Sequence, residues 1–262
     1  EPLSISKNKN AMFLRELGEV NSSLPLNIIK QNSILQYDTY KKTYCIITPN
    51  TVNETVNISQ YKKCGIDIGV RTFLTVFSKA ETFEIGTKTN AVIDKANKRL
   101  DKIRSSYDQQ IISKKQFSQL YNKYSDKIKN KITDMHYKVI TKLVGTYTEI
   151  LVPRLNVSNI MKKKELPVRA RQILQIESHG LFIKRLQQVA ERKGVTVRIV
   201  SEHLTSQACG KCFNLKKIKG KTYECDECKT TIDRDINGAR NIYILELCKI
   251  LLHIIKMLNE IN

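Results

Sequence analysis

Four of the seven cysteines form two C-x-x-C pairs, and this pairing constrains the fold more than any other feature of the 262-residue sequence. Cys209 and Cys212 make the first pair, Cys225 and Cys228 make the second, and twelve residues separate the pairs. Four thiolates at this spacing are typical of tetrahedral Zn²⁺ held by two knuckles, and four protein ligands leave no open position for a substrate. We therefore predict a structural zinc ribbon over residues 206–231.

The chain is strongly basic, with 45 Lys and Arg against 25 Asp and Glu and a net charge of +20. A field of that size attracts polyanions and is unusual for an enzyme of small neutral substrates. The charge favours nucleic acid as the partner, although an anionic membrane surface would also suit it. No window reaches the ~18 apolar residues of a membrane span, and the N-terminus lacks the apolar run of a signal peptide. We expect an intracellular protein, in the cytoplasm or the nucleus, with no membrane partner.

The order of the predicted elements is that of an α/β fold. Apolar residues at helical spacing over 90–147 predict two long basic helices that form a hairpin, and the same spacing over 168–194 predicts one helix that ends at a glycine. The last segment is an apolar helix. Three segments have the composition of strands: 62–78, which forms a hairpin around a turn, 148–155 and 195–204. We expect helices that cross a mixed sheet.

The chain divides into two parts in this interpretation. Residues 1–62 form a short, irregular and partly β N-terminal segment. Residues 63–262 form the core, which contains a helical insertion at 90–147 and the zinc ribbon.

Acidic residues fall at the ends of predicted elements, where they can converge on one edge of the sheet. Asp67 lies on the first strand of the hairpin, Glu202 lies near the end of a later strand, and Asp235 opens the last helix. Such a cluster is costly by mutual repulsion unless cations occupy it, and Mg²⁺ or Mn²⁺ would relieve the cost. Two such ions are what phosphodiester hydrolysis needs. Asp233 is expected to be a helix cap.

Several segments together resemble a known family. "GIDIGVRTFLTVFS", "LTSQACGKC", the second C-x-x-C pair and "DRDINGARNI" occur in this order and at distances similar to those in the RuvC-like nuclease core of TnpB proteins. These proteins are transposon-encoded, and their eukaryotic and viral relatives are the Fanzors. The resemblance covers about residues 60–245. It implies an RNase H-like fold with a helical-hairpin insertion and a zinc ribbon, and RNA-guided DNA cleavage with Mg²⁺ or Mn²⁺.

The resemblance also implies the catalytic residues. Asp67 stands in the G-x-D-x-G element, and Asp235 is the second Asp of D-R-D-x-N. Many TnpB proteins carry a middle Glu where this chain has Pro153. Fanzors and a related TnpB branch are similar to this chain in having a proline there, and they use a Glu shortly before T-S-x-x-C, which is Glu202 here. The predicted metal ligands are therefore Asp67, Glu202 and Asp235.

Basic side chains are expected to contact backbone phosphates, which makes binding steeply dependent on salt. They lie on the helix predicted over 168–194 and in the gap of the ribbon: Arg169, Arg171, Lys184, Arg185, Lys216, Lys217, Lys219 and Lys221. A lysine run is also typical of a merely solvated loop. On the same helix, Glu177 is expected on an ordinary polar face, and the histidines are expected to be satisfied surface or core residues.

Two classes of function remain open. One is a metal-dependent DNA endonuclease guided by an RNA, and the other is a nuclease-inactive protein that binds nucleic acid and regulates transcription. Only 66 residues precede Asp67. We therefore expect a reduced wedge and recognition region and a protein partner that replaces it. A nuclease that acts on DNA junctions would share the same fold and metals.

Overall fold

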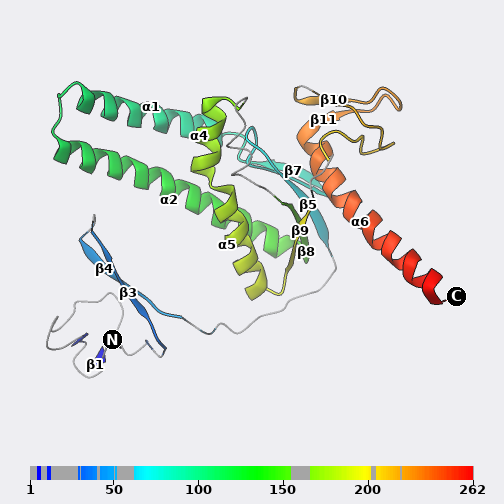
Figure 1. Ribbon diagram of the computed structural model, residues 1–262, viewed down its shortest axis with the longest axis horizontal. Coiled ribbons are helices and arrows are strands. Elements are labelled where there is room, and N and C mark those ends of the chain that lie inside the picture. Colours follow the sequence, from blue (N-terminus) through cyan, green and yellow to red (C-terminus); the bar gives the residue numbers. More distant parts are fainter. Residues whose placement is uncertain are drawn as a thin grey trace. The chain divides into compact units, whose positions relative to one another are not determined.

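The computed structural model describes residues 5–6, 11–12, 29, 31–39, 42–49, 51, 62–154, 166–201, 205–218 and 220–261, with side chains of the last helix as far as residue 248. The chain forms two compact units, residues 1–53 and 54–262 (Figure 1). Among the helices that the structure describes, none combines the length and the apolar character of a membrane-spanning segment.

The described residues of the unit 1–53 form two small antiparallel strand pairs. Its strands are β1 (Ile5–Ser6) with β2 (Ala11–Met12), and β3 (Ile34–Asp38) with β4 (Thr43–Ile47). Tyr37 and Tyr44 are cross-strand partners in the second pair, and their ring centroids lie 4.7 Å apart. The β character that we expected in this segment is confirmed for its described residues.

A five-stranded mixed sheet organises the unit of residues 54–262 (Figure 1). Its strands are β5 (Lys63–Ile68), β6 (Leu74–Ser78), β7 (Thr82–Ile85), β8 (Glu149–Pro153) and β9 (Thr196–Val200). They lie in the order β7-β6-β5-β8-β9, with β6 antiparallel to both of its neighbours and β8 parallel to both of its own. The predicted mixed sheet and its first hairpin are therefore confirmed.

Among its described residues, five helices accompany the sheet: α1 (Thr89–Asp108), α2 (Lys114–Thr146), α4 (Val168–Glu177), α5 (His179–Arg192) and α6 (Arg234–Ile261). α1 and α2 form the long hairpin that the apolar spacing predicted, and a capping box between Ser113 and Gln116 begins α2. The prediction of one helix over 168–194 was wrong. Ser178 adopts a left-handed backbone with φ of 48°, which ends α4 and begins α5 in a new direction.

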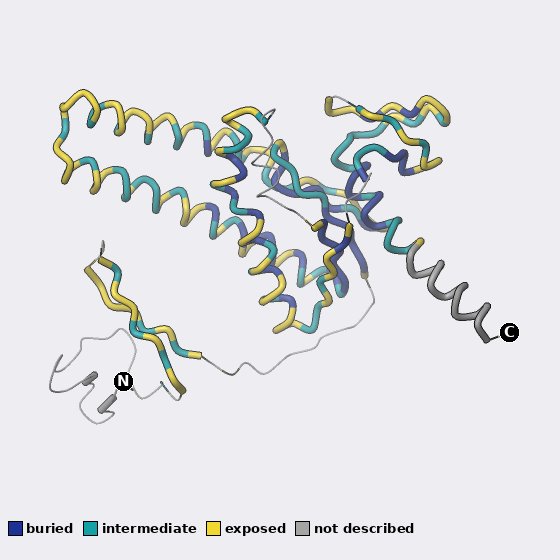
Figure 2. The backbone as a smooth tube through the Cα atoms, viewed as in Figure 1, coloured by how far each residue is buried: buried dark blue, intermediate teal, exposed yellow. Residues whose placement is uncertain are grey.

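The two faces of the sheet carry different helices because strand side chains alternate. Cys64 and Ile66 of β5 are buried in a core with side chains of α2 and α5. Gly65 and Asp67 alternate with them and face α6, so a Cβ added to Gly65 would lie 2.6 Å from the carbonyl oxygen of Ala239. Figure 2 shows buried positions gathered in the sheet and in the nearby parts of these helices, whereas the far ends of α1 and α2 are mostly exposed.

Ionisable side chains lie in this core at the break between α4 and α5. Glu177, His179 and His136 of α2 are all fully buried. The His136 Nε2–H donates to the carbonyl oxygen of Glu177 over 2.8 Å, and Arg185 donates to Nδ1 over 3.0 Å. The ring of Phe73 stacks with both imidazoles. The expectation of a satisfied histidine is confirmed for His136, but the polar face expected for Glu177 was wrong because the break turns Glu177 inward.

Burial keeps this group of side chains neutral. It raises the pKa of Glu177 from 4.5 to about 8 and lowers the pKa of His179 from 6.5 to about 4. The two side chains approach to 3.3 Å between His179 Nε2 and Glu177 Oε2. Near pH 7 the pair is therefore a carboxylic acid beside a neutral imidazole, which avoids placing charge in the core.

The raised pKa of Glu177 makes folding depend on pH. In the unfolded chain the carboxyl ionises above about pH 4.5, but in the folded chain it stays neutral up to about pH 8. The free energy of unfolding should thus fall as the pH rises through this window. Glu177→Gln keeps a neutral side chain at every pH. We therefore compare the free energy of unfolding of this variant with that of the parent. The difference should shift in favour of the variant by about 2–4 kcal/mol between pH 5 and pH 8. Denaturant unfolding at several pH values measures this difference. The exposed Glu191→Gln serves as the control, and a parallel pH profile in all three proteins would contradict the assignment.

Candidate functional site

Two of the predicted acidic residues line the same cavity. Asp67 reaches it from β5 and Asp235 from the first turn of α6, and the cavity has a volume of about 550 Å³. The loop at residues 68–71 and the segment at residues 205–207 complete most of its lining. The structure thus brings together residues that are 168 positions apart in the sequence.

Glycine on α6 allows the helix to approach the carboxylate of Asp67 directly. A Cβ added to Gly238 would lie 2.8 Å from Asp67 Oδ2, which is closer than a carbon atom can sit without displacing something. Gly65 permits the same approach one layer further along β5. The glycines therefore determine how closely the strand that carries Asp67 lies to the helix that carries Asp235.

Asp233 caps α6, as the sequence predicted. Its Oδ1 accepts hydrogen bonds from the backbone N–H groups of Asp235 at 2.8 Å and of Ile236 at 3.4 Å. Lys221 lies 3.5 Å from its other carboxylate oxygen. Because both oxygens are engaged in this way, Asp233 orients the first turn of the helix and leaves the cavity to Asp235.

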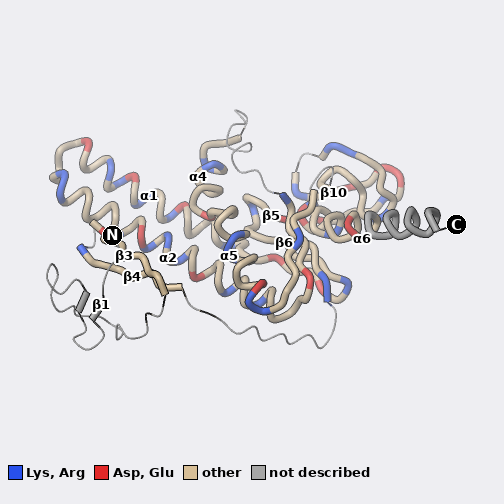
Figure 3. Tube along the Cα trace, turned by 60° about the horizontal axis from the view of Figure 1, so that its bottom comes forward, with Lys and Arg blue, Asp and Glu red and all other residues tan. Residues whose placement is uncertain are grey.

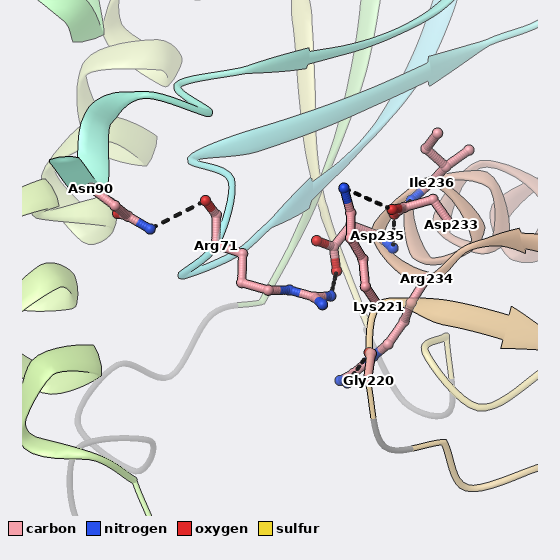
Figure 4. A network of polar contacts seen from close by, with 8 residues as sticks. All are labelled: Arg71, Asn90, Gly220, Lys221, Asp233, Arg234, Asp235 and Ile236. Atoms are coloured by element: carbon pink, nitrogen blue, oxygen red, sulfur yellow. Dashed lines mark hydrogen bonds and ion pairs between the residues drawn. The ribbon is translucent and has the colours of Figure 1, made fainter.

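Arg71 pairs with Asp235 across the cavity (Figure 4). Its Nη2 donates to Asp235 Oδ1 over 2.8 Å, and the side chains are 44% and 15% exposed respectively. Asn90 at the start of α1 donates to the carbonyl oxygens of Val70 at 2.8 Å and of Arg71 at 3.2 Å. Sequence reasoning missed Arg71, and its position four residues after Asp67, in the turn of the hairpin, was the available signal.

The third predicted metal ligand, Glu202, is not seen among the described residues at the cavity. Glu202 lies outside the described residues, which stop at Ser201 and resume at Thr205. Pro153 ends β8, and Gly65 of β5 pairs with Leu151 of β8, so two residues further along these parallel strands Asp67 and Pro153 stand at the same level. Position 153 is therefore beside Asp67, but the proline side chain has no atom that could bind a metal.

The four predicted cysteines come together as one cluster. Their sulfur atoms all lie within 4.8 Å of one another, with Cys209 to Cys228 at 3.6 Å and Cys212 to Cys225 at 3.4 Å. A tetrahedron with Zn–S bonds of ~2.3 Å has edges of about 3.8 Å, so the donor set fits zinc. Hydrogen bonds with Thr230 lower the pKa of Cys228 to about 6.

Strands and a buried tyrosine hold the cysteine cluster in shape. β10 (Thr222–Glu224) pairs with β11 (Thr231–Asp233) in an antiparallel hairpin. Tyr223 is fully buried beside the cysteines and donates to the carbonyl oxygens of Gln207 and Asn214. Because β11 ends at Asp233, the ribbon leads directly into α6 and its acidic residue.

Two buried asparagines fasten the start of the ribbon to α6, and sequence reasoning missed both. Asn237 donates to the carbonyl oxygen of Ala208 at 2.8 Å and accepts from the N–H of Gly210 at 3.0 Å. Asn241 donates to the carbonyl oxygens of Thr205 at 2.7 Å and of Ala208 at 2.8 Å. Asparagines four residues apart on an apolar helix were the signal, because such buried amides need partners.

Comparisons with known proteins agree with this arrangement. The family described as "Probable transposase" (OrfB_IS605) matches residues 47–164, and "Cas12f1-like, TNB domain" matches residues 179–242. TnpB-like protein L79 of Acanthamoeba polyphaga mimivirus is 34% identical over 86% of this chain and 45% of its own length. TnpB-like protein L770 of the same virus is also 34% identical, over 92% of this chain and 51% of its own length. The chain belongs to the TnpB family.

This TnpB-family chain spans about half the length of its mimivirus relatives. "Putative RNA-guided DNA endonuclease InsQ" of Escherichia coli (strain K12) is 26% identical over 92% of this chain and 63% of its own length. Among solved structures, the cryo-EM structure of the Cas12f1-sgRNA-target DNA complex has a TM-score of 0.50 and 17% identity, and covers 80% of this chain and 65% of that chain. At that identity the likeness is one of fold.

Basic residues of this TnpB-family chain are spread along α1 and α2 and around the ribbon (Figure 3). Some of the predicted phosphate contacts are engaged within the protein. Arg169 forms an ion pair with Asp94 of α1, and Arg185 bonds His136 in the core. Arg171 is half-buried and Lys184 is exposed.

The predicted lysines of the ribbon have different surroundings. Lys216 pairs with Asp226 and Lys221 pairs with Asp233. Lys217 is exposed, and Lys219 lies outside the described residues. The exposed Lys184 and Lys217 are thus better placed for a nucleic acid than the paired side chains.

The contact between α6 and Asp67 can be tested with one methyl group. Gly238→Ala should lower the free energy of unfolding by about 1–3 kcal/mol, because the added carbon forces the helix or the carboxylate to move. Gly145→Ala in α2 is the matched control, since its Cβ would meet no atom within 4 Å. That control should be neutral or stabilising by up to about 1 kcal/mol. Denaturant unfolding distinguishes the two, and equal effects would argue against the close approach.

The cysteine cluster should hold about one zinc ion per chain, measured by elemental analysis of the purified protein. Cys212→Ser should lower the bound zinc and the melting temperature, because it removes one of four ligands. Cys45→Ser removes an exposed thiol outside the cluster and should change neither. Equal zinc content in the parent and in Cys212→Ser would rule out this site.

Proposed function

We propose that this chain is the catalytic part of an RNA-guided DNA endonuclease with an RNase H-like fold and a Mg²⁺ or Mn²⁺ site. The observation that carries the proposal is the convergence of Asp67 and Asp235 on one cavity, in a chain of the TnpB family. Relatives of this family include one whose name states RNA-guided DNA endonuclease. The carboxylates provide the hard oxygen donors that these ions take.

The residues present fit a divalent metal site. Asp67 and Asp235 would hold the metal with Glu202, and the metal would supply an activated water and neutralise charge on the attacked phosphate. Arg71 pairs with one carboxylate oxygen of Asp235, so a metal at that oxygen would have to displace the guanidinium. Gly238 and the cap at Asp233 keep the two carboxylates in place.

Glu202 is the proposed third ligand. Val200 at the end of β9 faces α6 in a cluster with Leu151 and Ile242. In the sequence, Glu202 follows Val200 by two residues and precedes Thr205, which lines the cavity, by three. Pro153 removes the alternative place for a ligand on β8, which supports the assignment to Glu202.

The cysteine cluster is proposed to be a structural zinc ribbon and the basic surface to bind a guide RNA and target DNA. The solved complex of similar fold contains an sgRNA and target DNA, which supports both partners. Zinc held by four thiolates would stiffen the segment that enters α6, so the ribbon would help to position Asp235. The exposed Lys184 and Lys217 would contact phosphates.

A cleavage assay tests this proposal. The protein is purified with its co-expressed genomic flanking RNA and incubated with single- and double-stranded DNA in Mg²⁺ or Mn²⁺. Asp67→Asn, Glu202→Gln and Asp235→Asn should each lower the cleavage rate by ~10²-fold or more, because each removes a metal ligand. Asp134→Asn on the exposed face of α2 should cleave like the parent.

The outcomes separate the functions. Cleavage that is lost in all three variants and retained in Asp134→Asn supports the endonuclease with Glu202 as the third ligand. Cleavage that survives Glu202→Gln would remove that residue from the site. Tight binding of RNA and DNA without cleavage in the parent would sink the nuclease and leave a binding protein.

A further inference from the structure

We propose that Arg71 is a displaceable counter-ion of Asp235, which couples metal binding at that carboxylate to the arrival of a nucleic-acid phosphate. This inference rests on the proposed function, since the metal is the one assigned to Asp67 and Asp235. Arg71 would then be a positioning residue. When a substrate phosphate binds the guanidinium of Arg71, the ion pair with Asp235 would open and the carboxylate would be available to the metal.

The first step is that Arg71 and a metal compete for the same atom. Arg71 Nη2 lies 2.8 Å from Asp235 Oδ1, which is the distance of a charge-assisted hydrogen bond. A divalent ion bound to that oxygen would place two positive charges beside the guanidinium. Repulsion between them makes simultaneous occupation costly, so binding of the metal requires the ion pair to open.

The second step is that the side chain of Arg71 can move while its backbone stays in place. The side chain is 44% exposed, whereas that of Asp235 is only 15% exposed. Asn90 holds the carbonyl oxygens of Val70 and Arg71, which ties the turn to the start of α1 (Figure 4). Rotation of the long side chain therefore suffices to open the pair, and no rearrangement of the loop is needed.

The third step concerns the other charges of the cavity. Arg234 also lines it, and Lys221 pairs with Asp233 outside it. Arg234 Nη1 lies 3.5 Å from the carbonyl oxygen of Gly220, so within the described residues its guanidinium points toward the ribbon. Among the described residues that line the cavity, Arg71 is thus the cationic side chain that contacts Asp235.

The last step is the partner that receives Arg71. A guanidinium binds phosphate oxygens with two parallel hydrogen bonds, and a scissile phosphate must enter this same cavity to reach the metal. Phosphate binding would draw Arg71 away from Asp235 and so strengthen metal binding. By linkage, the metal would strengthen phosphate binding by the same factor. Without nucleic acid, Arg71 would keep the metal site weak.

The test measures Mn²⁺ binding without nucleic acid. Zinc-loaded protein is titrated with Mn²⁺, and the electron paramagnetic resonance signal reports the concentration of free Mn²⁺. Arg71→Ala should bind Mn²⁺ about three- to ten-fold more tightly than the parent, which is the range expected for loss of a partly exposed ion pair. Arg192→Ala removes an equal charge from an exposed position on α5 and should leave the affinity unchanged. Arg71→Gln provides a second variant if Arg71→Ala unfolds.

The coupling is measured by repeating the titration with a phosphorothioate-linked single-stranded DNA 15-mer. In the parent, the oligonucleotide should tighten Mn²⁺ binding, and in Arg71→Ala the ratio of affinities with and without DNA should be at least about three-fold smaller. Unchanged or weaker Mn²⁺ binding by the Arg71 variants, or an undiminished ratio, would overturn the role of Arg71. Asp235→Asn separates the two proposals: if it binds Mn²⁺ like the parent, the metal site of the proposed function is itself wrong.

Discussion

The close packing of α6 on β5 is the contact on which the rest of the site depends. Gly65 on the strand and Gly238 on the helix lack the Cβ atoms that would hold the two elements apart. The helix therefore brings Asp235 to the cavity that Asp67 reaches from the strand. The opposite face of the same strand is buried against α2 and α5, so β5 is held from both sides. The metal site proposed for these two carboxylates would need such a rigid base, because small displacements weaken coordination.

Ionisable side chains have different surroundings at the cavity and in the core. At the cavity, Asp235 pairs with Arg71, whose side chain is partly exposed to solvent. In the core at the α4–α5 break, Glu177 and His179 have no such access to water. Burial raises the pKa of Glu177 and lowers the pKa of His179, which favours the neutral form of each. The difference follows from desolvation, which penalises the charged form where no strong partner compensates. Acidic side chains of one protein thus line an open cavity in one place and form packed neutral groups in another.

Much of this organisation could be predicted from local sequence patterns. The C-x-x-C pairs predicted the cysteine cluster, the β-branched and aromatic residues on both sides of a glycine-containing turn predicted the hairpin, and the spacing in α1 and α2 predicted the long helices. The left-handed turn at Ser178 could not be foreseen, because serine carries no strong signal for positive φ. The roles of Asn237 and Asn241 were hidden for another reason. Their partners lie on a distant segment, and no local pattern identifies a tertiary hydrogen bond.

The sequence by itself determined most of the elements, the four thiols of the cluster and the chemical types of the acidic residues, since these depend on local spacing and composition. Only the tertiary structure decided which residues meet. It placed Asp67 and Asp235 on one cavity, set Arg71 against Asp235, and turned Glu177 into the core. These pairings join residues far apart in the chain through sheet order and helix packing. They are therefore properties of the whole fold, which a reading along the chain cannot supply.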